Sequence, residues 1–134
     1  MSRIRATAVV VKEGKLLMIH RINHGEEYWV LPGGKVDEGE TFEQAVIREL
    51  DEETSIQGEV EKEILNFVDS KNDRQVLFSI KYISGEPALR PDSEEANSAD
   101  SEQSYKPEWV EIDKVSGLSI YPKEEKNFLI TYFK

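Results

Sequence analysis

The sequence of 134 residues contains no cysteine and only two histidines, His20 and His24. Without cysteine the chain has neither disulfide bonds nor thiolate metal sites, and two histidines alone do not build a typical zinc site. Any bound metal is therefore expected to be a hard cation held by oxygen atoms, such as Mg²⁺ or Mn²⁺.

Long apolar runs and positive charges are also scarce. The apolar run at residues 6–11 is too short for the core of an ordinary signal peptide, and no segment reaches the roughly 18 apolar residues of a membrane helix. Lysine and arginine number 17 against 27 aspartates and glutamates, which gives a formal net charge of −10. We therefore expect a cytoplasmic protein that binds neither a membrane nor duplex nucleic acid, with no signal of its oligomeric state. An anionic small molecule would need a local basic patch or a bridging cation.

An apolar fraction of 38% is enough for the core of one domain over residues 1–134. Patterns of β-branched and apolar residues predict strands at residues 6–11, 16–20, 28–31, 59–68, 75–84 and 109–112. The first two strands are expected to form a hairpin. Residues 32–40 and 85–107 are rich in glycine, proline and polar residues and are predicted to be irregular.

Two helices complete the expected order of elements. Thr41 and Gln44 fit a capping box at the start of a helix that should end near Thr54. A final helix should follow with Pro122 in its first turn. Its apolar residues, expected to pack on the sheet, are Phe128, Leu129, Tyr132 and Phe133. This order of strands and helices predicts an α+β or α/β layered domain.

The first of these helices carries a dense group of acids in the segment RELDEETS, residues 48–55. Glu49, Glu52 and Glu53 are neighbours on a helix surface, and two of them fall beside Phe42 at the edge of the apolar stripe. Two charges about 6 Å apart repel by roughly 3 kcal/mol at an effective dielectric near 20. Arg48 can pair with Glu52, which relieves only one of these repulsions. The helix alone leaves two interpretations open, a solvated acidic face and a metal site.

Together with the loop before it, this helix resembles the Nudix box of hydrolases that act on nucleoside diphosphates linked to another moiety. The family pattern is a glycine, five residues, a glutamate, seven residues, and then R-E-aliphatic-any-E-E-any-G-aliphatic. In GKVDEGETFEQAVIRELDEETSI all fixed positions but one agree, namely Gly34, Glu40, Arg48, Glu49, Leu50, Glu52, Glu53 and Ile56. The flanking segments WVLPGG and PEWVEIDKV also look like the family.

The departure is Ser55, where the family has glycine. That glycine follows the end of the helix, where the backbone often turns left-handed. Serine in this conformation costs roughly 1 kcal/mol relative to glycine. Because the position supplies no metal ligand, the resemblance implies that the chemistry survives, and only the path of the chain after the helix is open.

The resemblance implies an α/β/α sandwich with a mixed β-sheet between helices. The metal ligands that it implies for Mg²⁺ or Mn²⁺ are the carboxylates of Glu49, Glu52, Glu53 and Glu102 and the backbone carbonyl of Gly33. Glu102 is assigned only as the acid of a later loop, and a solvated loop acid is the alternative. Arg48 and Glu40 would orient the carboxylates, against the alternative of a surface ion pair, and either Glu49 or Glu52 would take the proton from water.

The implied reaction is hydrolysis of a small-molecule nucleotide at a phosphoanhydride bond. The short chain favours a nucleoside triphosphate pyrophosphohydrolase that releases monophosphate and pyrophosphate. Markers of two other subfamilies are not evident near Lys71 and Asn72. An ADP-ribose or sugar-nucleotide pyrophosphatase stays open, as does a non-catalytic nucleotide-sensing module, which the intact acidic set disfavours. A P-loop is rejected, because no Gly-Lys-Ser/Thr follows Pro32.

Overall fold

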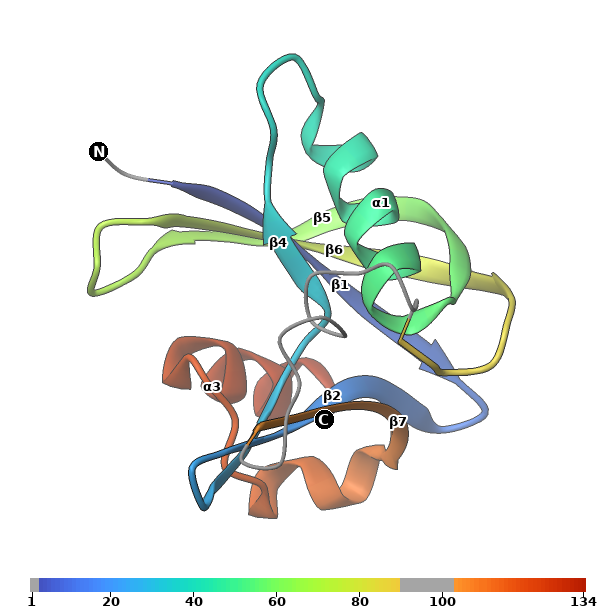
Figure 1. Ribbon diagram of the computed structural model, residues 1–134, viewed down its shortest axis with the longest axis vertical. Coiled ribbons are helices and arrows are strands. Elements are labelled where there is room, and N and C mark those ends of the chain that lie inside the picture. Colours follow the sequence, from blue (N-terminus) through green and yellow to red (C-terminus); the bar gives the residue numbers. More distant parts are fainter. Residues whose placement is uncertain (1–2, 90–102) are drawn as a thin grey trace.

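The computed structural model describes residues 3–89 and 103–134 of the chain (Figure 1). Its elements in chain order are β1 (Ile4–Lys12), β2 (Lys15–Asn23), β3 (Glu26–Val30), β4 (Gly33–Lys35), α1 (Phe42–Thr54), β5 (Gln57–Val68), β6 (Arg74–Ser84), β7 (Gln103–Glu111), the 3₁₀ helix η1 (Ile112–Gly117) and α3 (Lys123–Tyr132).

The strands form a mixed sheet whose two halves separate beyond the β1–β2 turn. β1 and β2 pair only beside this turn, where Val11 faces Leu16 and Lys12 faces Lys15. Farther along, β1 pairs in parallel with β6 and antiparallel with β4, while β2 pairs antiparallel with β3 and β7. The predicted hairpin is therefore confirmed only at its tip, because each strand then takes other partners.

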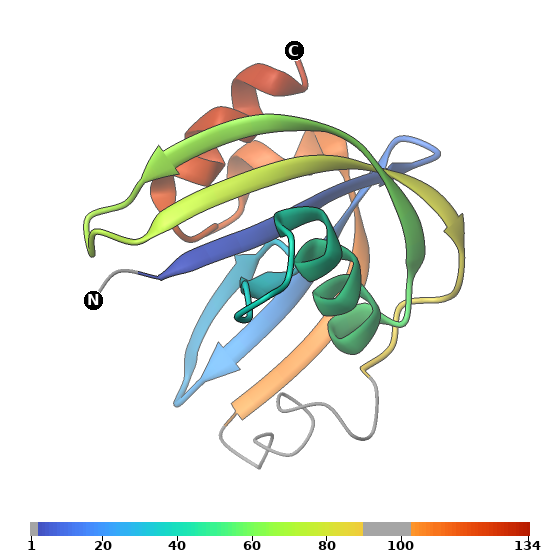
Figure 2. The same ribbon diagram turned by 90° about the horizontal axis from the view of Figure 1, so that it is seen from above.

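Helices α1 and α3 lie on opposite sides of β1, β5 and β6 (Figure 2). Ala45, Val46 and Leu50 of α1 belong to one apolar core with residues of β1 and β6. Leu129 of α3 belongs to a second core, which contains Leu77 of β6. The prediction of a mixed sheet between helices is confirmed, since an apolar face on each side of the sheet is covered by a helix.

The predicted limits of α1 are confirmed. Thr41 Oγ1 accepts from the Gln44 backbone N–H at 3.0 Å, and Gln44 Oε1 accepts from the Thr41 N–H at 2.9 Å. The helix ends at Thr54, as expected from the apolar spacing. Its position relative to the sheet is set by the buried residues of its inner face, so the cap and the apolar stripe together aim the acidic side chains.

The prediction of an irregular segment after Pro32 is wrong at its start. Gly33 begins β4, which pairs with β1 through Thr7 and Ala6. A Cβ atom on Gly33 would lie 2.6 Å from the Ala6 carbonyl oxygen. Glycine here permits two backbones to approach closely, so it allows a strand instead of ending one.

The predicted loop at residues 85–107 is wrong at its end, because residues 103–107 belong to β7 and pair along β2. Polar side chains hide this strand from an apolar pattern. Ile112, expected in the strand, instead begins η1. The part of the expected loop at residues 90–102 lies outside the described residues.

The last helix differs from its prediction in two details. Pro122 is the N-cap of α3 and does not lie within its first turn. Leu129 is buried and Phe128 and Phe133 pack on the second core, but Tyr132 is 40% exposed. Tyr132 stacks on Phe128 with ring centroids 5.2 Å apart, so it covers the outer side of the helix and not the sheet.

Candidate active site

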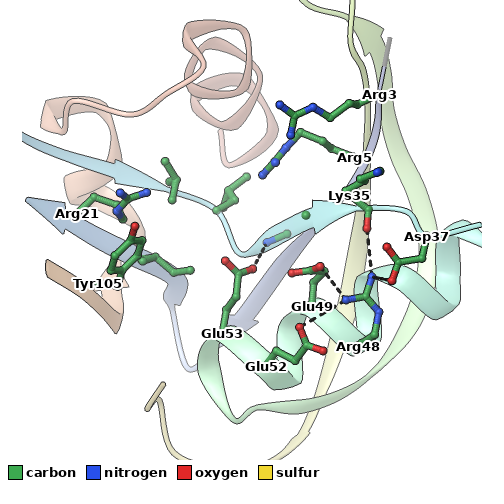
Figure 3. A pocket seen from close by; sticks show the side chains of 15 residues that line it. Arg3, Arg5, Arg21, Lys35, Asp37, Arg48, Glu49, Glu52, Glu53 and Tyr105 are labelled. Atoms are coloured by element: carbon green, nitrogen blue, oxygen red, sulfur yellow. Dashed lines mark hydrogen bonds and ion pairs between the residues drawn. The ribbon is translucent and has the colours of Figure 1, made fainter. Parts of the chain in front are cut away.

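A pocket of about 650 Å³ lies between α1, β4 and the ends of β1, β2 and β7. Glu49, Glu52 and Glu53 line it from α1, and Gly33 and Gly34 line it from β4. Figure 3 shows these carboxylates beside the β4 backbone, with Arg21 and Tyr105 on the opposite side. The helix therefore turns its acids toward a cavity, as their place beside the apolar stripe predicts.

Arg48 is the centre of the ionic contacts in this pocket. Its Nε and Nη2 donate to the two oxygens of Glu40 at 2.7 and 3.0 Å, a bidentate pair. Its Nη1 donates to Glu49 at 2.8 Å and, more weakly, to Glu52 at 3.4 Å. The expectation that Arg48 relieves one repulsion only is wrong, because one guanidinium reaches both acids.

The same guanidinium connects the helix to the preceding loop. Nη2 of Arg48 donates to the Lys35 carbonyl at 3.1 Å and lies 3.3 Å from Asp37. Glu40 also accepts from the Asp37 N–H at 2.9 Å. The hydrogen bond from Arg48 is the largest cause that lowers the pKa of Glu40, and the same contact raises the pKa of Arg48. Both groups are thus charged near neutral pH, and they hold the loop against the helix.

Glu53 is buried, with only 7% of its surface exposed. Its Oε1 accepts from the Gly33 backbone N–H at 2.8 Å. A carboxylate this deep requires such a partner, since burial without one is costly. The bond also ties the end of α1 to the start of β4.

Gly34 makes room for Glu49. A Cβ atom on Gly34 would lie 2.4 Å from the Glu49 carboxyl carbon. The carboxylate therefore rests directly on the β4 backbone, in a space that any other residue would fill. This contact gives a physical reason for glycine at the first position of the motif.

Ser55 adopts the left-handed conformation, with φ 63° and ψ 12°, that a glycine would take there. Its N–H donates to the Asp51 carbonyl at 2.9 Å, and its hydroxyl donates to the Ala88 carbonyl at 2.7 Å. The path of the chain after α1 is therefore the ordinary one. Ser55 thus carries the strain of the left-handed conformation, and its hydroxyl contact offsets part of that cost.

Basic side chains that the sequence did not point out line the rest of the pocket: Arg3 just before β1, Arg5 near the start of β1, Arg21 on β2 and Lys35 on β4. Arg21 lies 3.8 Å above the ring of Tyr105, and its Nε is buried without a hydrogen-bond partner in the described structure. The alternation of Arg3 and Arg5 was a usable signal, because residues two apart on a strand share a face. Only the tertiary arrangement shows that this face adjoins α1.

The donor set of the pocket fits a hard cation. Within residues 3–89 and 103–134, no three acidic or histidine side chains stand ready as a metal-binding cluster. Four carboxylates, however, contact the single guanidinium of Arg48, so negative charge is in excess in this part of the pocket, while the basic side chains line the rest of it. Carboxylate oxygens are the ligands that Mg²⁺ prefers.

The structure brings together most of the predicted site residues. Those from the loop and the helix share the pocket or its ionic contacts, namely Gly33, Glu40, Arg48, Glu49, Glu52 and Glu53. Glu102 lies outside the described residues. In the described part of the chain, no helix has the length and apolar character needed to cross a membrane.

Comparison with known sequences identifies relatives. The profile of the family described as "NUDIX domain" matches residues 1–131. An oxidized purine nucleoside triphosphate hydrolase of Danio rerio is 30% identical over 142 residues, covering 99% of this chain and 86% of the relative. An ADP-ribose pyrophosphatase of Methanocaldococcus jannaschii is 35% identical over 105 residues, and an RNA pyrophosphohydrolase of Pelagibacter ubique is 36% identical over 78 residues. These two matches span only 61% and 49% of the relatives' own lengths.

Several solved structures have a similar fold. The E. coli ORF135 protein has a TM-score of 0.71 at 19% identity, covering 98% of this chain and 89% of that one. A MutT NUDIX hydrolase from Burkholderia pseudomallei has a TM-score of 0.56 at 29% identity, covering 84% and 85%. The first of these likenesses concerns the fold alone.

Proposed function

Because this chain belongs to the Nudix family of pyrophosphohydrolases, we propose that it hydrolyses a phosphoanhydride bond in a nucleoside diphosphate linked to another moiety. The proposed substrate is a nucleoside triphosphate, which water splits into a nucleoside monophosphate and pyrophosphate. The observation that carries the proposal is a pocket that the three helix acids of the motif, Glu49, Glu52 and Glu53, line together with arginines from other elements (Figure 3). The chain is further proposed to act as a single domain in the cytoplasm.

The acids of α1 are proposed to bind metal. Glu49, Glu52 and Glu53, with the backbone carbonyl of Gly33, would hold Mg²⁺ or Mn²⁺, and Glu102 would join them. When bound, such ions neutralise charge on phosphate oxygens and polarise the attacking water. Arg48 positions two of these acids, and the Gly33 N–H positions the third.

Glu52 is our choice for the general base. Glu49 Oε1 accepts a 2.8 Å bond from Arg48, and its side chain is only 13% exposed. Glu52 has the longer 3.4 Å contact with Arg48 and is 45% exposed. A general base needs an oxygen that water can reach and that is not committed to a short ion pair.

Arg3, Arg5 and Arg21 are proposed to bind the phosphates that the metal does not neutralise. They lie across the pocket from the acids, and guanidinium groups suit phosphate oxygens. In this arrangement the leaving pyrophosphate would take its proton from water. Binding of an anion by a chain with net charge −10 then depends on a local basic surface.

ADP-ribose or a sugar nucleotide is the second candidate substrate. The 35% identity to an ADP-ribose pyrophosphatase over 72% of this chain favours it. The same acids and arginines would act on its central diphosphate, so the two candidates differ only in the group beyond the phosphates.

A panel of nucleoside triphosphates, ADP-ribose and sugar nucleotides, assayed with and without Mg²⁺, tests the proposal. We expect metal-dependent turnover of the triphosphates. Tight binding of nucleotide without turnover under any condition would refute it and favour a sensor.

Glu52→Gln tests the assignment of the base, with Glu43→Gln as the matched control. Glu43 is exposed on the same helix and does not line the pocket. We expect Glu52→Gln to lose at least ~10²-fold in turnover while it stays folded, and the control to keep its activity. Wild-type turnover in Glu52→Gln would move the role to Glu49.

A further inference from the structure

Arg21 lies in the middle of a row of three side chains that crosses three strands. In the register of the sheet it stands directly opposite Tyr28 of β3 on one side and Tyr105 of β7 on the other. Directly opposed side chains point to the same face of a sheet and lie within reach of one another. That face lines the active-site pocket, because Arg21 and Ile19, two residues apart on β2, both line it.

Two aromatic rings hold the guanidinium group of Arg21. Its Cζ atom lies 3.8 Å from the ring centroid of Tyr105 and 5.4 Å from that of Tyr28. Both distances are within the range over which an aromatic ring attracts a cation, and the first is a close contact. All three side chains are half-buried, and the attraction is stronger where water is partly excluded. Tyr105 is therefore the main support of this guanidinium, and Tyr28 is a weaker one.

Arg48, on the other side of the pocket, is supported in a different way (Figure 3). Its guanidinium contacts four carboxylates, so its charge and its N–H donors are already engaged. Arg21 takes part in none of the ion pairs within residues 3–89 and 103–134, and its buried Nε has no hydrogen-bond partner there. Because a tyrosine ring has no net charge, it attracts a cation without neutralising it. Arg21 is thus held in place while its full charge stays available to an anion.

We propose that Tyr105 is a positioning residue, whose ring fixes the Arg21 guanidinium at the wall of the pocket and leaves its charge and N–H donors to a phosphate of the substrate. This inference rests on the proposed function, in which Arg21 binds phosphate. Ordering a long arginine side chain during binding costs conformational entropy. A ring that orders it beforehand removes part of that cost, so the affinity for phosphate depends on the residue at position 105.

Binding of a diphosphate analogue that water does not split tests this inference separately from catalysis. The probe is methylenediphosphonate in buffer with Mg²⁺, and titration calorimetry measures its dissociation constant. We expect Tyr105→Leu, which removes the ring, to raise this constant by roughly 5- to 30-fold. Tyr105→Phe should stay within about 2-fold of the wild type, because it keeps the ring and loses only a long 3.4 Å contact from the hydroxyl to Gln103.

A double-mutant cycle separates an effect through Arg21 from a general disturbance of β7. Arg21→Met removes the guanidinium and should itself weaken binding of the probe by at least ~10-fold. In that background Tyr105→Leu should change the dissociation constant by less than about 2-fold, because the ring has no cation left to hold. An equal loss in both backgrounds would overturn the inference, as would wild-type affinity in either single variant.

The charge on the ring face can also be varied while the shape of the ring is kept. Placing phenylalanines with one, two and three ring fluorine atoms at position 105 withdraws negative charge from that face in steps. We expect the dissociation constant of the probe to rise with each fluorine, since the attraction depends on that charge. An unchanged constant across the series would overturn the inference, even where Tyr105→Leu does not fold.

The matched control is Tyr132→Leu, which removes a 40% exposed tyrosine of α3 that does not line the pocket. It should bind the probe as the wild type does. Coupled loss of binding in a protein that splits no nucleotide would sustain this inference and refute the proposed hydrolysis. Nucleotide turnover in a protein without that coupling would refute this inference alone. A wild type that does not bind the probe would also overturn it.

Discussion

Replacing Glu125 by glutamine should change how the stability of the protein depends on pH. Glu125 lies in the first turn of α3, and burial raises its pKa to about 8 in the folded protein against an ordinary value of 4.5. Between these two values the folded state binds more protons than the unfolded state, so the free energy of unfolding falls as pH rises. At about 1.4 kcal/mol for each pKa unit, the whole effect is at most about 5 kcal/mol.

Glutamine is neutral in both states and removes this dependence. The variant should match the wild type near pH 4.5 and become progressively more stable than it up to about pH 8, beyond which the difference is constant. The other charged groups around the cavity that Glu125 lines are present in both proteins, and they differ only through their interaction with the Glu125 charge: Arg3, Arg5, Glu26, Asp69, Lys71, Asp73, Lys123 and Glu124. The difference between the two curves therefore isolates Glu125.

Urea denaturation followed by far-UV circular dichroism, repeated across this pH range, measures the difference. Glu63→Gln, an exposed acid, is the control and should give a curve parallel to the wild type. If the Glu125→Gln curve also runs parallel to the wild type from about pH 5 to about pH 8, the carboxyl is not held neutral by burial, and the reasoning fails.

Three further substitutions test the active site and its supports. Gly34→Ala should lower kcat/KM by at least ~10-fold while it changes stability by only about 1 kcal/mol, because the new methyl group displaces the Glu49 carboxylate; wild-type kinetics would contradict this. Glu40→Gln should lower the free energy of unfolding by about 1–2 kcal/mol at pH 7 by weakening the bidentate pair with Arg48. Because the pKa of Glu40 is lowered by folding, the gap should close as pH falls through that lowered pKa, and a gap that persists in acid would argue against the ion pair. Ser55→Gly should leave activity unchanged and stability within about 0.5 kcal/mol, since relief of left-handed strain offsets a lost hydroxyl contact, and thermal melting would reveal a larger effect.

The metal ligands, the base and the role of Glu102 stay predictions. The described pocket places Glu49, Glu52 and Glu53 beside one another, but the activity of a metal-loaded protein decides their roles. The assay panel with and without Mg²⁺ tests metal binding by the three acids together. Glu102→Gln tests whether the acid of the later loop contributes.

The features of this protein that could be inferred from sequence are local ones. A capping box, an apolar repeat and the spacing of acids act within one helix, so Thr41, the end of the helix at Thr54 and the direction of Glu49 and Glu53 follow from neighbouring residues. The motif adds Gly34 and Glu40, which lie only a few residues before that helix.

Such local patterns do not predict contacts between segments that lie far apart in the sequence. β4 forms because Gly33 fits against Ala6, and the start of β7 forms because polar residues find open hydrogen-bonding groups on β2. The basic wall of Arg3 and Arg5 and the buried carboxyl of Glu125 come from opposite ends of the chain and meet beside one cavity. Local spacing thus specified the acidic helix and the direction of its acids. Sheet pairing and helix packing, which join residues with no fixed sequence separation, decided what lies opposite that helix.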